Sequence, residues 1–189
     1  MASGLAVAAI GVGCASVPQI VSLTRGEGAA ASAASEASPL EVVTVGTTVR
    51  DPLPVRGSDV VYADLESALG TAIASATRPW AAAHGADATA AHGGWTVLVE
   101  IARADADLEG GGRVVVGIDA RATLRARHGN VYLGQTQIGC REGGLVEASG
   151  GSPVVHRCMV DMARELAGWL AGGVPLDPPE DPAQSGQSE

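Results

Sequence analysis

The sequence contains no lysine and no phenylalanine, and both absences narrow what the protein can do. All 12 basic residues are arginines, so a P-loop lysine, a Schiff-base lysine and a serine–lysine dyad are excluded. With aromatic residues at only 3%, the large core side chains must be valine, leucine, isoleucine and the three tryptophans. The net charge of −9 argues against a general nucleic-acid-binding surface.

Recognised catalytic motifs are also missing. The sequence has no Gly-x-Ser-x-Gly elbow, no His-Glu-x-x-His pair and no doubled Cys-x-x-Cys. We therefore expect a protein that is not an enzyme and that needs no cofactor or metal. A length of 189 residues allows one domain with flanking tails.

Residues 1–14, MASGLAVAAIGVGC, resemble the end of a bacterial lipoprotein signal peptide. An uncharged apolar run, too short for a stable transmembrane helix, leads through small residues to Cys14, which would carry the lipid. Gly11 replaces the usual leucine, and the usual positive N-terminal region is missing. The alternatives are an incidental cysteine or a signal peptide that is cut later. Ala15 after the cysteine resembles the pattern for delivery to the periplasmic face of the outer membrane.

The remaining chain divides by composition into three parts. Residues 15–39 are expected to be a disordered tether, because small and polar residues dominate them without an apolar period. Residues 40–173 should form an α+β domain. The proline-rich acidic residues 174–189 should form a disordered tail.

Alternating apolar and polar residues predict a long hairpin over 113–140. A two-residue turn at His128-Gly129 would place Ala126 opposite Val131 and Leu124 opposite Leu133. The apolar residues of the first hairpin strand all fall on one face: Val114, Val116, Ile118, Ala120, Ala122, Leu124 and Ala126.

Two more strands are predicted before the hairpin. The first, over 41–50, is rich in β-branched residues and is stopped by Asp51–Pro54. The second runs over 95–105, with Trp95 beginning its apolar face, and a turn over 107–112 connects it to the hairpin.

Apolar residues at three- and four-residue spacing predict two amphipathic helices. One covers about 59–77 after a cap at Ser58-Asp59, and a loop over 84–94 follows it. The other covers 153–171 and ends at Gly172-Gly173. The order of elements predicts a four-stranded, mainly antiparallel sheet with both helices on one face.

Cys140 and Cys158 are the most specific pair of residues in the domain. In an exported chain they would form a disulfide that ties the last helix to the sheet. The alternatives are a metal site that adds His156 and lacks a fourth ligand, or two free buried thiols.

Arg121, Arg125 and Arg127 should share the polar face of the hairpin. They could contact anionic headgroups or an acidic partner, and the alternative is a solvated strand face with Asp119 as an ion-pair partner. His84 and His92 lack further metal ligands nearby.

Asp105, Asp107 and Glu109 lack the EF-hand spacing, so a solvated acidic turn is favoured over a Ca²⁺ site.

The sequence resembles the ABC-type transport auxiliary lipoproteins in the order of its elements. The matching elements are Cys14, the strand at 41–50, the helix near 59–77, the strands over 95–140 and the helix at 153–171. The resemblance covers about two thirds of the chain and rests on element order. It implies a non-enzymatic periplasmic lipoprotein that helps an ABC-type system move lipid between envelope membranes. Its partners would be transporter and lipid-binding subunits, and its N-terminal lipid would hold it on the membrane.

Two other functions fit the same order of elements. One is an outer-membrane assembly lipoprotein, such as the plug-like partner of the lipopolysaccharide translocon, which would bind a β-barrel. The other is a regulatory lipoprotein that binds a cell-wall synthase. The identity of the co-purifying partner separates these functions from the first.

Overall fold

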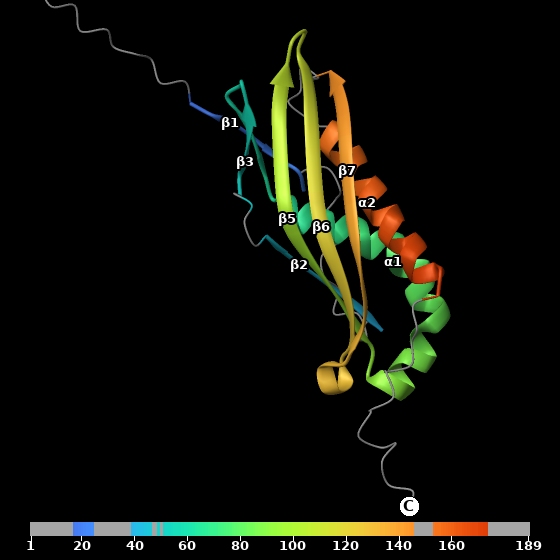
Figure 1. Ribbon diagram of the computed structural model, residues 1–189. Coiled ribbons are helices and arrows are strands. Elements are labelled where there is room, and N and C mark those ends of the chain that lie inside the picture. Colours follow the sequence, from blue (N-terminus) through green and yellow to red (C-terminus); the bar gives the residue numbers. More distant parts are fainter. Residues whose placement is uncertain (1–16, 25–38, 47–48, 50, 146–152, 174–189) are drawn as a thin grey trace, which may run out of the picture.

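The computed structural model describes residues 17–24, 39–46, 49, 51–145 and 153–173. These residues form an α+β fold in which a mixed seven-stranded sheet carries two long helices on one face (Figure 1). No helix in this part of the chain combines the length and hydropathy needed to cross a bilayer. The elements are β1 (Gln19–Ser22), β2 (Leu40–Gly46), β3 (Leu53–Arg56), β4 (Val60–Ala63), α1 (Leu65–His92), β5 (Trp95–Glu109), β6 (Arg113–Ala126), η1 (His128–Asn130), β7 (Tyr132–Leu145) and α2 (Pro153–Ala171).

Three long antiparallel strands, β5, β6 and β7, form the centre of the sheet. Every apolar residue that alternation assigned to the inner face of β6 is buried, from Val114 to Ala126. Trp95, Val97, Val99 and Ile101 of β5 are buried as predicted. The period of two therefore identified the core face of the central strands.

The turn between β6 and β7 is longer than the predicted two residues. It is the 3₁₀ turn η1, and Gly129 and Asn130 there adopt positive φ values of 75° and 52°. Arg125 lies opposite Tyr132, but Leu124 lies opposite Gly134 instead of Leu133 because the register shifts between them. Because of this bulge, the pairing of Leu124 differs from the predicted one by one residue, while Leu124 and Leu133 are both buried.

The prediction of a four-stranded, mainly antiparallel sheet is wrong in the number of strands and in the direction of several of them. β2 runs parallel to β5, and β1 runs parallel to β4. The short strands β1, β4 and β3 extend the sheet beyond the edge of β5. Strands of four residues are too short to display a period, so the sequence pattern does not reveal them.

The first helix begins later and ends later than predicted. Val60–Ala63 is strand β4, and Ser58 caps a turn instead of a helix, its hydroxyl accepting from Val60 N at 3.1 Å. At the other end, α1 continues through Pro79 to His92, so the predicted loop over 84–94 is mostly helix. Figure 1 shows α1 bending along its length, as helices do around an internal proline.

The second helix matches its prediction. It spans Pro153–Ala171, and Gly173 follows it with a φ of 91°. Its buried stripe packs on β6 and β7 and on α1. Glu165 of this helix accepts a hydrogen bond from Gly139 N at the edge of β7, at 3.2 Å. One backbone donor of this edge strand is thereby covered.

Part of the predicted tether is folded, and two strands are longer than expected. Residues 19–22 form β1, so the prediction of a continuous disordered segment over 15–39 is wrong for them. β5 runs to Glu109 and β7 to Leu145, each four or five residues beyond its expected end. These extensions pair with β6, which supplies a partner along its whole length.

Candidate functional site

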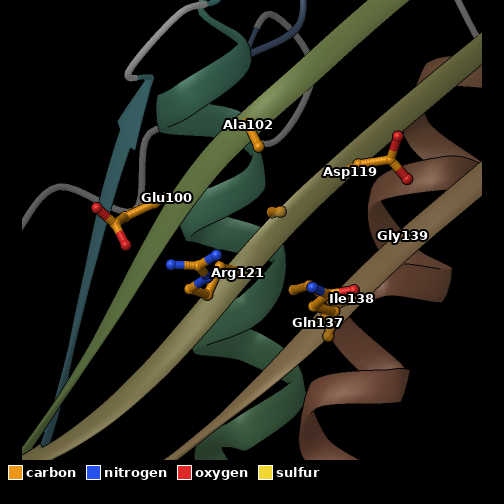
Figure 2. Close-up of a pocket in the computed structure, with 8 residues that line it drawn as sticks. Glu100, Ala102, Asp119, Arg121, Gln137, Ile138 and Gly139 are labelled. Atoms are coloured by element: carbon orange, nitrogen blue, oxygen red, sulfur yellow. The ribbon is translucent and has the colours of Figure 1, made fainter.

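The side of the sheet that faces away from the helices carries a shallow depression, and we call this side the outer face. Figure 2 shows the depression over β5, β6 and β7, with both helices behind the sheet. Its volume is about 540 Å³. It is lined by Glu100, Ala102, Asp119, Ala120, Arg121, Gln137, Ile138 and Gly139.

A bulge in β5 shapes one side of this depression. The register with β6 shifts between Ile101 and Arg103, so Ala102 is an extra residue that reaches the outer face. The shift also keeps Arg103 and Asp105 on the same face as Glu100, because it reverses the alternation along β5. Without the bulge, these charged residues would point into the core.

Glycines on the outer face let charged side chains lie across the sheet. A Cβ atom at Gly139 would stand 2.9 Å from Asp119 Oδ1, and one at Gly143 would stand 2.6 Å from Arg113 Nη2. Side chains at these two positions of β7 would therefore displace Asp119 and Arg113. The carboxylate of Asp119 consequently lies toward the edge of the sheet.

Arg121 provides the one positive charge among the residues that line the depression. It is exposed and pairs across the sheet with Glu100 on β5 and with Gln137 on β7. Within the described part of the chain, no carboxylate forms an ion pair with it. Two carboxylates, one guanidinium and one amide are therefore presented together on a rigid sheet.

The other two predicted arginines do not extend this site. Arg125 is half-buried and donates to Asn130 Oδ1 at 3.4 Å. Arg127 lies beyond the end of β6, and its Nη2 atom is 3.5 Å from Glu41. Of the three predicted arginines, Arg121 is open to solvent and the other two contact neighbouring polar residues, so they do not form a continuous basic row.

A second charged group lies farther along the outer face, near the β5–β6 turn. Arg56 of β3 donates from Nε and Nη2 to the two carboxylate oxygens of Asp107, both at 2.6 Å. Arg103 lies 2.8 Å from Asp105. The two aspartates belong to β5, so the predicted acidic turn over 107–112 is wrong for Asp107, which is paired with arginine.

The hydrogen bonds from Arg56 lower the pKa of Asp107. The ion pair therefore contributes stability above the ordinary carboxyl pKa, and this contribution is lost as the pH falls through the lowered value. We expect Arg56→Gln to raise the pKa of Asp107 in a carboxyl NMR titration. Arg164→Gln on α2 is the matched control and should leave the pKa of Asp107 unchanged. If the pKa of Asp107 is also unchanged in Arg56→Gln, this assignment is contradicted.

Cys140 and Cys158 form a disulfide that connects β7 to α2. Their Cα atoms are 5.4 Å apart, and Cys158 is fully buried. His156, which would complete the alternative metal site, is exposed and lines a groove between the two helices. The sulfur atoms are therefore bonded to each other in this fold.

The remaining predicted residues are distributed as follows. His84 lies in α1, where its ring stacks on Trp80 and its Nδ1 atom is 2.9 Å from the Trp80 carbonyl oxygen. Among the described residues, no group of three or more His, Cys, Asp or Glu side chains could hold a metal ion. Cys14 lies outside the described residues.

Arg121 and its possible ion-pair partner Asp119 were named from the sequence, but Glu100 and Gln137 were not. Glu100, Asp119 and Gln137 fall on the polar side of the alternating pattern, which is the available signal. Their proximity depends on the register of three strands and on the bulge at Ala102, and neither can be read from a single strand.

Comparison with known proteins gives structural neighbours alone. No family model and no curated protein sequence matches the chain. A Xanthomonas campestris protein described as a member of family DUF330 is 13% identical, covers 70% of this chain and 83% of its own, and has a TM-score of 0.46. A candidate lipoprotein from Caulobacter crescentus is 15% identical, covers 72% of this chain and 93% of its own, and has a TM-score of 0.37.

Proposed function

We propose that this chain is a lipid-anchored, non-enzymatic accessory protein of the bacterial envelope that binds another envelope protein through the outer face of its sheet. The lipid would be attached to Cys14, and the Cys140–Cys158 disulfide suits an oxidising compartment outside the cytoplasm. The partner we propose is an ABC-type lipid transport complex, as the order of sequence elements implies.

The observation that carries the binding role is the depression around Arg121. Glu100, Asp119, Arg121 and Gln137 offer acceptors and donors that no described element covers. The two carboxylates of the site, Glu100 and Asp119, can accept hydrogen bonds from a partner, and Arg121 and Gln137 can donate them. The mixed charge of the site suits a protein surface with both donors and acceptors better than a uniformly anionic lipid surface.

Affinity purification from detergent-solubilised envelopes tests both parts of this proposal. We expect wild type to retain labelled palmitate and to co-purify ABC transporter subunits. Arg121→Glu should keep the lipid, but the amount of co-purified subunits should fall at least tenfold, because a third carboxylate would replace the central cation. Cys14→Ala should lose the palmitate and leave the membrane fraction.

Arg164→Glu provides a matched charge reversal on the exposed side of α2, and it should co-purify the partner as wild type does. Recovery of a β-barrel or of a cell-wall synthase in place of transporter subunits would overturn the transport role. Equal recovery with Arg121→Glu would overturn the outer-face site.

A further inference from the structure

The first described residues join the sheet almost immediately after Cys14. Gln19 N donates to Asp59 O at 2.7 Å, and Leu23 N donates to Ala63 O at 3.1 Å. Between them, β1 pairs with β4 over four residues, and Ser22 Oγ donates to Asp64 at 2.6 Å. The fold therefore holds the chain by backbone and side-chain bonds over Gln19–Leu23.

Covalent geometry then limits how far Cys14 can be from the domain. Four residues, 15–18, separate Cys14 from Gln19, where the fold first holds the chain. A fully extended chain spans at most about 3.6 Å per residue, or about 18 Å over these five steps. A flexible tether over 15–39 would instead have allowed a separation of about 25–30 Å. A lipid on Cys14 would thus hold the folded domain against the bilayer surface.

The position of β1 identifies the end of the domain that would face the bilayer. Gln19 lies beside the β3–β4 turn through its bond to Asp59. In that turn, a Cβ atom at Gly57 would stand 3.4 Å from the carbonyl oxygen of Leu108, near the end of β5. Figure 1 shows β1 in blue on the same side of the molecule as the β3–β4 turn, and η1 at the opposite end.

The exposed apolar residues of this end fit the same arrangement. Val17 is 87% exposed and Ile20 is 66% exposed. Leu145, which pairs with Arg113 beside the β5–β6 turn, is 70% exposed. Contact with the interfacial region of a bilayer would remove part of this apolar surface from water.

We infer that the domain lies directly on a lipid bilayer, with the end formed by the β3–β4 turn and the β5–β6 turn facing the lipid and η1 facing away. This inference rests on the proposed lipid anchor and adds the orientation. β6 has 14 residues, so η1 would stand up to about 45 Å from the bilayer end. Arg121 is eight residues from Arg113, so the partner would contact the depression up to about 26 Å above that end.

Energy transfer to the membrane surface tests this orientation. The full chain is purified in two variants with one added cysteine, Asp59→Cys or His128→Cys, both at exposed positions. Each is labelled with a maleimide donor dye without reductant, so that the disulfide stays intact. The proteins are reconstituted in phosphatidylethanolamine–phosphatidylglycerol vesicles that contain a headgroup acceptor dye. We expect transfer from position 59 to be at least twofold more efficient than from position 128.

A linker variant tests whether the short connection between Cys14 and β1 is what holds position 59 near the bilayer. Inserting about 20 Gly-Ser residues between Ser16 and Val17 should lower the transfer from position 59 toward that from position 128, because the domain could then leave the surface. Equal or reversed transfer in the original chain, or no effect of the linker, would overturn the orientation. If the chain carries no palmitate and does not float with the vesicles, the proposed anchor itself fails.

Discussion

Replacing Cys140 and Cys158 together by alanine is expected to lower the free energy of unfolding by about 3 kcal/mol. The two cysteines are 18 residues apart, and their bond closes a loop that the unfolded chain would otherwise leave open. The bond also attaches α2 to β7, where Cys158 is part of the core. Urea unfolding followed by circular dichroism measures the change.

The single variants provide the control for this prediction. Cys140→Ala and Cys158→Ala each remove the bridge, so each should lose nearly as much stability as the double variant. Wild type unfolded in the presence of a reductant should approach the same value. A loss below about 1 kcal/mol in the double variant would mean that the disulfide contributes little beyond the packing of the two side chains.

Replacing Trp95 by alanine is expected to lower the free energy of unfolding by about 3–5 kcal/mol, the largest effect of a single substitution that we predict here. Trp95 is 1% exposed, and its ring lies 4.8 Å from that of Trp80 on α1. Alanine would leave a cavity in the core beside the Trp80 ring. The same urea titration measures the loss.

The matched variant is Trp95→Phe, which should cost less than about 1.5 kcal/mol. The Nε1 atom of Trp95 is buried and finds no acceptor among the described residues, so phenylalanine would remove an unpaired polar group. Hydrogen exchange should show faster opening of α1 after Trp80 in Trp95→Ala and little change in Trp95→Phe. Equal losses in the two variants would contradict the role of ring packing.

Sequence periodicity predicted the parts of the fold in which one strand or helix displays its own pattern. The inner face of β6, the first half of β5 and the whole of α2 are correct for this reason. Cys140 and Cys158 were paired on their positions at the end of a strand and the beginning of a helix. Each of these predictions depends on local order and on one buried face.

The errors have a common origin in contacts between distant segments. β2 joins β5 in parallel across the whole of α1, and β1 finds β4 about 40 residues later in the chain. The second half of α1 contains Pro79 and Gly85, two residues that disfavour a helix interior. Packing of Trp80 on Trp95, together with helix-favouring alanines, stabilises the helix there.

The sequence by itself determined the α+β class, the apolar face of the central strands, the second helix and the exclusion of lysine chemistry. Tertiary structure decided the number and direction of strands, because pairing depends on backbone partners that carry no local pattern. It also decided the candidate site, since the bulge at Ala102 and the register of β5, β6 and β7 bring Glu100, Asp119, Arg121 and Gln137 together. Arg125 and Arg127, which looked equivalent to Arg121 in the sequence, contact Asn130 and Glu41 because the strand ends at Ala126.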